Sequence, residues 1–233
     1  MEEPILEVGV GTGRILRTLA EHRSLLVGID ADPEMIRHFD EKLRNNDKLR
    51  LSIDLVVADG ETLPFRDGVF GGVICVRVLK YFHRPLAGLA EMRRILRTRG
   101  KMMVEFANMF GMGALIQLPG YVLKGEFYPR LFTRKGVDAW MTGLDMSVGE
   151  VVAWHKLPPR IVTASNNHVV LRIFSLFEDF LQRTTPTEFM ARSIVMSALK
   201  NPKMLEKNTS LHDLPMGKHD SPVRSIVQDR GTP

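Results

Sequence analysis

The chain of 233 residues contains a single cysteine, Cys75, which excludes an intramolecular disulfide and is typical of a reducing compartment. Its first residues lack a basic stretch followed by an apolar stretch. No apolar run approaches the about 20 residues that span a bilayer. These absences predict a cytoplasmic protein without a transmembrane segment, and they leave contact with a membrane surface open.

The sequence also has no large excess of one charge sign, and its histidines lack metal-ligand spacing. The 32 Lys and Arg residues exceed the 27 Asp and Glu residues by five, and the basic residues are scattered among the acidic ones. No pair of the seven histidines has His-x-x-x-His spacing. We therefore expect no metal site and no nucleic-acid partner.

Apolar runs alternate with helical patterns over the first 107 residues. This alternation predicts an α/β, Rossmann-like, doubly wound parallel sheet with helices on both faces. The expected strands are 4–8, 24–30, 51–59, 72–78 and 101–107, and the expected helices are 13–22, 32–46 and 85–97.

The pattern changes after Asn108. An apolar stretch broken by glycines and Pro119 predicts an insertion over 109–135 that closes over the substrate as a lid. Further expected elements are helices at 134–143 and 169–182 and strands at 146–155 and 190–200. We expect one domain over 1–200 and a disordered polar tail over 201–233.

Three glycines follow the first expected strand in the stretch EVGVGTGR, at Gly9, Gly11 and Gly13. A dinucleotide fingerprint has its third glycine one residue later, at the position of Arg14. Glu7 ends the strand, and its negative charge would repel a pyrophosphate. That charge favours instead a ligand with ammonium and sulfonium groups, such as S-adenosylmethionine.

Carboxylates also end the next two expected strands. Asp30 is placed to accept hydrogen bonds from a ribose diol, and Asp59 from an adenine amino group. Because the carboxyl ends of parallel strands meet at one edge of the sheet, Glu7, Asp30 and Asp59 are expected to share one crevice.

Four segments resemble successive motifs of the class I S-adenosylmethionine-dependent methyltransferases, type 11 group. They are EVGVGTGR, VGIDADPEMI, VVADGETLPFRDGVF and LAEMRRILRTRGKMMVEFAN. The group modifies small molecules, quinones and lipids. The resemblance covers about residues 4–108 and implies a seven-stranded sheet with an antiparallel last strand.

The resemblance also implies contacts with S-adenosylmethionine at eight positions. The methionine portion falls to Glu7, Gly9, Gly11 and Gly13, the ribose to Asp30, and the adenine to Asp59 with Gly60, while Arg77 borders the cofactor.

The segment after the fourth expected strand, RVLKYFHRP, departs from the family pattern, which is often rich in His and Asn. His83 is our candidate for a catalytic base in this segment. We expect substrate contacts from Tyr81, Phe82, Asn108 and Met109.

Two motifs of nucleic-acid methyltransferases are lacking, the Asn/Asp-Pro-Pro-aromatic sequence and a Pro-Cys pair. We therefore expect methyl transfer to oxygen or carbon of a small, apolar acceptor, such as a quinone or lipid. Because no dedicated catalytic motif is present, a non-catalytic cofactor-binding or regulatory subunit is an alternative. An NAD-dependent oxidoreductase is a further alternative, which Glu7 and Arg14 disfavour. A homodimer stays open.

Overall fold

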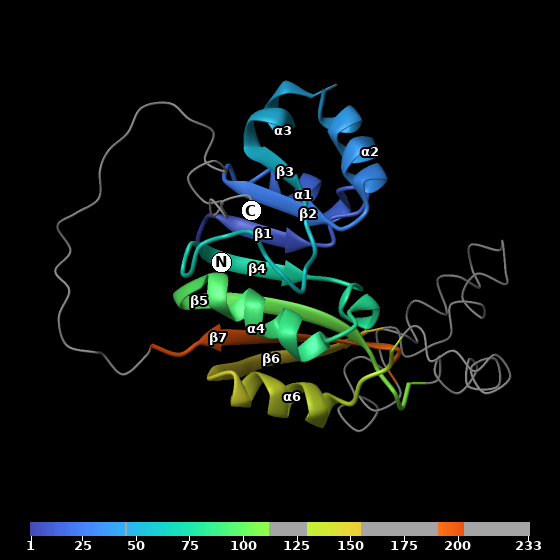
Figure 1. Cartoon of the computed structure of the whole chain (residues 1–233), viewed down its shortest axis with the longest axis vertical. Coiled ribbons are helices and arrows are strands. Elements are labelled where there is room, and N and C mark those ends of the chain that lie inside the picture. The colour runs from blue at the N-terminus through green and yellow to red at the C-terminus, as the bar shows by residue number, and fades with distance from the viewer. Residues whose placement is uncertain (45, 112–129, 155–190, 203–233) are drawn as a thin grey trace, which may run out of the picture.

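The computed structural model describes residues 1–44, 46–111, 130–154 and 191–202. Over these residues, seven strands form a single sheet (Figure 1). The strands are β1 (Ile5–Val8), β2 (Leu26–Asp30), β3 (Ile53–Val57), β4 (Phe70–Cys75), β5 (Leu96–Ala107), β6 (Met146–Trp154) and β7 (Ser193–Lys200). The helices are α1 (Arg14–Leu19), α2 (Pro33–Arg44), α3 (Asp47–Ser52), the 3-10 helix η1 (Leu79–Tyr81), α4 (Pro85–Ile95) and α6 (Arg134–Gly143).

The strand order is β3-β2-β1-β4-β5-β7-β6. The first five strands in this order are parallel, and β7 runs antiparallel to both of its neighbours. The expected seven-stranded, mostly parallel sheet with an antiparallel last strand is therefore confirmed. Because connections cross over between parallel strands, the carboxyl ends of β1 to β5 meet at one edge.

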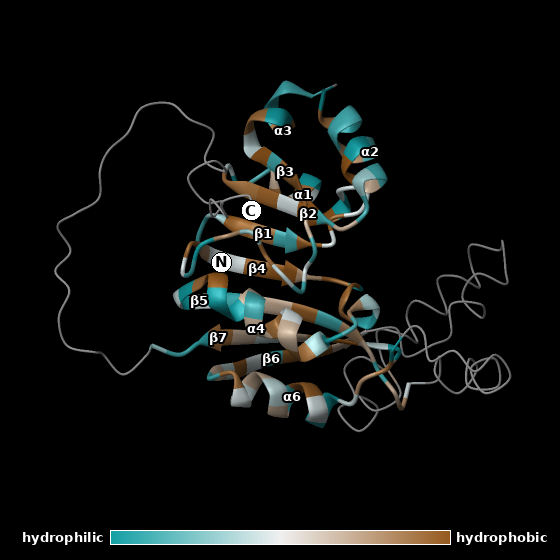
Figure 2. Ribbon diagram, viewed as in Figure 1, coloured by the Kyte–Doolittle hydropathy of each residue, from teal (hydrophilic) through white to brown (hydrophobic). Residues whose placement is uncertain are grey.

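Both faces of the sheet are covered. On β1, Ile5 packs with α1 and α2, and the next residue, Leu6, packs in the cluster that includes α4 and α6. Val73 and Ile74 of β4 divide between the same two clusters. Successive side chains of a strand point to opposite faces, so a strand that is buried twice is a continuous apolar run. Figure 2 shows these strands in brown and much of α2 in teal.

Local signals account for several boundaries. Asp32 caps α2 by accepting a hydrogen bond from the Glu34 amide at 2.9 Å, and Pro33 is the first helical residue. The prediction of a strand from residue 51 was wrong, because α3 runs through Ser52 and is capped by Asn46. The expected strand 72–78 ends earlier, at Cys75, and Arg77 adopts a left-handed backbone with φ of 63°.

Strand β5 begins five residues earlier than expected, at Leu96. Its register against β4 shifts between Phe70 and Gly72, and Arg99 has a φ of 62°. The strand therefore absorbs an irregularity next to Gly100.

Arg94 of α4 fastens the LPFRDG loop that precedes β4. Its guanidinium donates to the carbonyl oxygens of Leu63 at 3.0 Å and Phe65 at 2.7 Å, and it is ion-paired with Asp67 and Glu91. Hydrogen bonds to the two carboxylates raise its pKa above the ordinary value. The motif thus has a structural role, which is to hold the loop on α4.

Some expectations fall outside the described residues. They are the helix at 169–182, the lid from residue 112 to 129, and the tail from residue 203. The division into a domain over 1–200 and a tail over 201–233 stays a prediction. Within the described part of the chain, each helix is too short or too polar to cross a bilayer.

Candidate cofactor and acceptor cavity

The glycine turn joins β1 to α1 in a left-handed backbone. Gly9, Gly11 and Gly13 have φ values of 74°, 51° and 81°. A Cβ at Gly9 would collide with Val78, and one at Gly13 with the ring of Phe39. At Gly11 a Cβ would meet no atom within 4 Å. The first and third glycines are thus required by packing, and the middle one lies below open space.

Asp30 ties the turn to the end of β2. One carboxylate oxygen accepts a hydrogen bond from the Gly11 amide at 2.8 Å, and the other accepts from the Asp32 amide at 3.1 Å. Each oxygen of a carboxylate has a second acceptor site. Asp30 can therefore hold the turn and still accept hydrogen bonds from a ligand hydroxyl.

Asp59 lies beyond the end of β3. Its Oδ1 accepts from the Glu61 amide at 2.9 Å, and the side chain is exposed. The next residue, Gly60, is buried, and a Cβ there would press on Val8 and Phe82. The carboxylate of Asp59 is thus turned outward beside a tightly packed backbone.

Glu7 behaves differently from the sequence argument. Its side chain is only 3% exposed, and its Oε2 accepts a hydrogen bond from the Leu16 amide at 3.2 Å. Burial raises the pKa of Glu7 to about 8, against the opposing effects of that hydrogen bond and of Arg14. At pH 7 the group is mostly protonated, so the expected attraction of its charge for a cationic ligand is largely lost.

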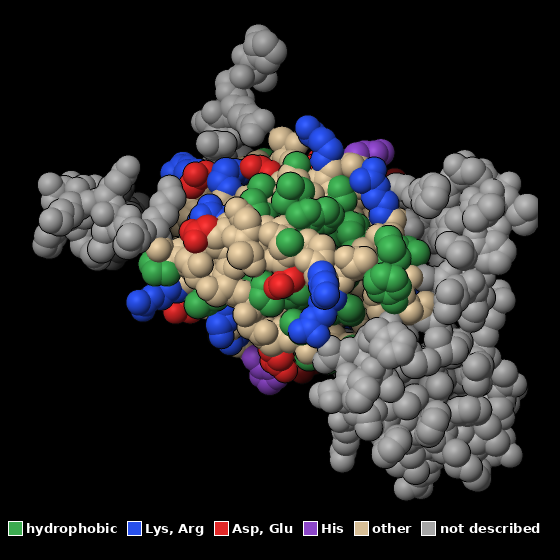
Figure 3. Space-filling view, turned by 90° about the horizontal axis from the view of Figure 1, so that it is seen from below, with side chains coloured by type: hydrophobic (Ala, Val, Ile, Leu, Met, Phe, Trp, Pro, Cys, Tyr) green, Lys and Arg blue, Asp and Glu red, His purple; other side chains and the backbone are tan. Residues whose placement is uncertain are grey.

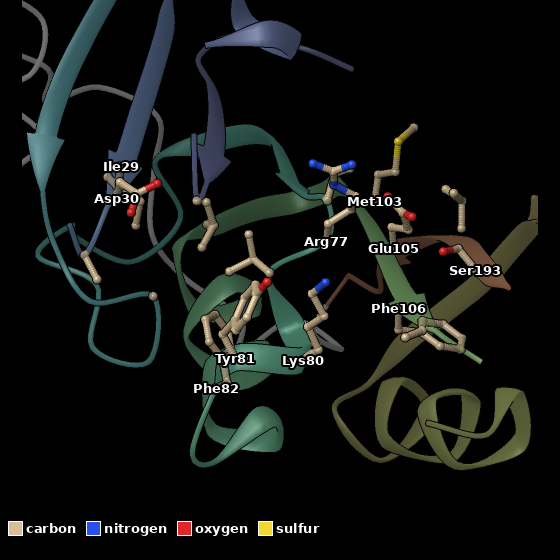
Figure 4. Close-up of a pocket in the computed structure, with 18 of the residues that line it drawn as sticks. Ile29, Asp30, Arg77, Lys80, Tyr81, Phe82, Met103, Glu105, Phe106 and Ser193 are labelled. Carbon is tan, nitrogen blue, oxygen red and sulfur yellow. The ribbon is translucent and has the colours of Figure 1, made fainter. Parts of the chain in front are cut away.

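A cavity of about 1280 Å³ follows the carboxyl edge of the sheet. In Figure 4, Asp30 lies on one side, Arg77 and Glu105 lie across from it, and Lys80 and Tyr81 lie between. The predicted residues that line the cavity are Gly9, Asp30, Asp59, Gly60, Arg77, Tyr81, Phe82, His83 and Asn108. The predicted residues outside its wall are Glu7, Gly11, Gly13 and Met109.

The segment after β4 forms the middle of the wall. Lys80 Nζ lies 4.8 Å from the ring centroid of Tyr81, which is 52% exposed. Phe82 is only 6% exposed and is packed between Gly60 and Gly88. Phe82 therefore contributes mainly to the core and presents little surface to a substrate, whereas Tyr81 is accessible.

Glu61 positions the candidate base, a role that the sequence did not reveal. Its carboxylate accepts hydrogen bonds from the backbone amides of His83 at 2.6 Å and Arg84 at 2.8 Å, just before α4. The side chain of His83 itself is exposed. The sequence shows that Glu61 lies two residues after Asp59. Only the fold brings its carboxylate to the backbone amides that precede α4.

Asn108 closes the end of β5. Its side-chain amide donates to the carbonyl oxygen of Ala191 at 2.9 Å, and its backbone amide donates to that of Arg192 at 2.9 Å. The residue lines the cavity and is buried. It therefore holds the entry to β7 in place, in addition to any contact with a substrate.

The far wall comes from one face of β5, β6 and β7, and sequence reasoning missed it. Its residues alternate along the strands: Met103 and Glu105 on β5, Glu150 and Val152 on β6, and Ser193, Val195 and Ser197 on β7. No motif marks them, because their shared face depends on the register of three strands.

The chain resembles known proteins over part of its length. Residues 6–104 match the family model described as a methyltransferase domain. This segment is a methyltransferase domain. Its fold is that of the class I methyltransferases, and its sequence resembles their type 11 group.

The relatives of the methyltransferase domain match the same part of the chain. The ubiquinone/menaquinone biosynthesis C-methyltransferase UbiE of Citrifermentans bemidjiense is 33% identical over 108 residues, which are 45% of this chain and 46% of that protein. The chain thus spans less than half the length of the curated relatives that it matches.

Solved structures extend the likeness beyond the methyltransferase domain. A putative methyltransferase from Bacillus halodurans has a TM-score of 0.59 at 18% identity, and the match covers 85% of this chain and 92% of that one. Magnesium protoporphyrin IX methyltransferase from Synechocystis, with bound SAH, has a TM-score of 0.59 at 14% identity, covering 84% of this chain and 74% of that one. At these identities the likeness shows the fold.

Proposed function

We propose that the domain binds S-adenosylmethionine in the 1280 Å³ cavity and transfers its methyl group to a small, largely apolar acceptor. One observation carries this proposal: Gly9 of the glycine turn, Asp30 and Asp59 lie along one cavity at the ends of β1, β2 and β3. They do so within residues 6–104, which belong to a methyltransferase family.

The residues present fit the cofactor. The cavity exceeds the roughly 300–1,000 Å³ that encloses one drug-sized ligand, so donor and acceptor can occupy it together. The carboxylates of Asp30 and Asp59 can accept hydrogen bonds from a diol and an amino group. Above Gly11 there is space for close approach of a ligand to the backbone.

S-adenosylmethionine supplies, when bound, a methyl group activated by the adjacent sulfonium charge. The contribution of the chain is mainly alignment, because displacement at the methyl carbon needs the acceptor atom in line with the sulfur. Met103, Val152 and Val195 offer apolar surface to the acceptor, which helps to exclude water from it. His83 is the proposed general base, which would take the proton of an acceptor hydroxyl while Glu61 holds its backbone.

An acceptor of the quinol class is supported by two features. The far wall has an apolar part at Met103, Val152 and Val195, and a relative of 33% identity is named as a ubiquinone/menaquinone biosynthesis C-methyltransferase. The proposed lid over 109–135 would add further apolar surface, and it begins at the exposed side chains of Met109 and Phe110.

Calorimetry with S-adenosylmethionine tests the cofactor assignment. Asp30→Ala should weaken the binding of S-adenosylmethionine by roughly 1.5–3 kcal/mol, because a ribose hydroxyl that is desolvated in the complex loses its hydrogen-bond acceptor. The control Asp40→Ala removes an acid of α2 that is ion-paired with Arg44 and lies outside the cavity wall. Unchanged affinity in Asp30→Ala would remove this assignment, and tight binding of NADH by the unaltered chain would overturn the proposed function.

Labelled S-adenosylmethionine with a demethylmenaquinol tests the reaction. Labelled quinol supports the proposal, and binding without transfer to that acceptor or to a lipid extract favours the non-catalytic alternative. With His83 as the base, His83→Gln lowers kcat while the affinity for S-adenosylmethionine stays within about twofold.

A further inference from the structure

A second hollow of about 570 Å³ lies among α1, α2 and α3, the helices that surround β2 and β3 (Figure 1). It is separate from the chemistry proposed above, apart from Arg14, which lines both cavities. Its lining is Thr12, Arg14, Arg17, Thr18, Ala20, Glu21, Lys42, Asn46, Lys48 and Leu49.

The lining of this hollow is predominantly basic. Arg14, Arg17, Lys42 and Lys48 face a single acid, Glu21. Within the described residues, none of these four cations has a carboxylate within 4.0 Å. Four cations around one cavity repel one another, and an anion placed among them would relieve that repulsion.

The outer face of α2 shows the contrast. Arg37 is ion-paired with Glu34 and Glu41, and Arg44 with Asp40 at 2.8 Å. At the opposite end of the molecule, seen in Figure 3, Lys and Arg side chains are interspersed with Asp and Glu. Within α2, therefore, the two arginines of the outer face are ion-paired, whereas Lys42 at the hollow is not ion-paired with any described residue.

The polar groups in the hollow suit phosphate oxygens. Asn46 Oδ1 accepts from the Leu49 amide at 3.2 Å, which leaves its NH₂ group as a donor. Thr12 adds a hydroxyl, whereas the hydroxyl of Thr18 donates to the carbonyl oxygen of Arg14 at 3.2 Å. No aromatic side chain is among the lining residues, so a nucleobase would find no ring on which to stack. The hollow can therefore bind the negative charge and the oxygen atoms of a phosphate, but its lining offers no ring on which a nucleobase could stack.

We propose that this basic hollow binds a small molecule with two or more phosphate groups. Its volume is that of a small-ligand site, and its four cations match the charge of such a ligand. The same ligand would be disfavoured at the cofactor end of the larger cavity, where Asp30, Asp32 and Asp59 gather. The proposal does not depend on methyl transfer.

Calorimetry of the full chain with inorganic tripolyphosphate tests the proposal. The double variant Arg17→Gln/Lys42→Gln removes two cations that line only the hollow. Its matched control, Arg37→Gln/Arg44→Gln, removes two exposed and ion-paired cations and so lowers the net charge equally. Circular dichroism verifies that both variants are folded.

The expected result is an affinity about tenfold or more weaker in the first variant, and within about twofold of the unaltered chain in the control. Three results would overturn the proposal. They are no binding of tripolyphosphate at millimolar concentration, equal losses in the two variants, and much tighter binding of a single-stranded oligonucleotide with affinity that grows with its length. The last outcome would mark the hollow as part of a nucleic-acid surface.

Discussion

The two halves of the sheet contribute to the cavity in different ways. In the half formed by β3, β2, β1 and β4, the lining residues lie just at or beyond the strand ends, as Gly9, Asp30 and Asp59 do. In the half formed by β5, β7 and β6, they lie along a face of the strands, as Glu105 and Val195 do.

The difference follows from what covers each half. Strands such as β1 and β4 are buried on both faces, so only their ends are free to meet a ligand. Along β7, fully buried and half-buried residues alternate, and Ser193, Val195 and Ser197 of the half-buried set line the cavity. We infer that the first half holds the methyl donor by loops and the second half shapes the space for the acceptor.

The largest effect is expected in the glycine turn. Gly13→Ala would force a Cβ into the ring of the fully buried Phe39 at a φ of 81°, so we expect a loss of roughly 3–5 kcal/mol in the free energy of unfolding, or failure to fold. Gly11→Ala is the matched control, with a positive φ but open space, and should cost only about 1 kcal/mol. Urea unfolding measures both.

The same glycine pair separates stability from binding. Gly11→Ala should lose most of the affinity for S-adenosylmethionine, because its methyl group would occupy the space above the turn. If both variants unfolded at the same urea concentration, the packing of Gly13 against Phe39 would not be what the turn requires.

Glu7 differs from Asp30 and Asp59, because its side chain is buried and does not line the cavity. Because its folded pKa is raised to about 8, the folded chain binds more protons than the unfolded chain between about pH 4.5 and 8. Stability should therefore fall as pH rises through this window. Glu7→Gln should remove the fall and exceed the unaltered chain by roughly 2–5 kcal/mol above pH 8.

Urea unfolding at several pH values measures the effect of Glu7. The control is Glu41→Gln, an exposed acid on α2. Parallel pH dependence in the Glu7 and Glu41 variants would mean that Glu7 is charged in the folded chain at neutral pH.

A change in the second half of the sheet should affect only the acceptor. Val195→Trp narrows the cavity from β7, so we expect about tenfold higher KM for a demethylmenaquinol, or ~1.4 kcal/mol, with unchanged affinity for S-adenosylmethionine. Leu199→Trp, on the same face of β7 but outside the cavity wall, is the control. A loss of affinity for S-adenosylmethionine in Val195→Trp would contradict the assignment of donor and acceptor to different halves of the sheet.

The smallest effect concerns Cys75, the last residue of β4. Its side chain is fully buried, and burial raises the pKa of the thiol to about 12. We expect no reaction with a disulfide reagent in the folded chain and complete reaction in guanidinium. Rapid labelling of the folded chain would show that this strand end, too, reaches the cavity.

The first five strands and the glycine turn were predictable because each depends on short-range patterns. A doubly buried strand is an uninterrupted apolar run such as PILEV, and a left-handed turn requires residues such as Gly9 and Gly13. Asp30 and Asp59 could be placed because parallel strands end at one edge. These features need only the local sequence and the topology that it implies.

Other features were decided by contacts between segments far apart in the chain. Burial under α1 turned Glu7 from an expected carboxylate into a mostly protonated acid, because the pKa depends on solvent that the sequence does not show. Glu61 meets His83 only once α4 is packed on the sheet. The face with Glu105 and Val195, and the basic hollow of Arg17 and Lys42, require registers and helix positions that no local pattern encodes.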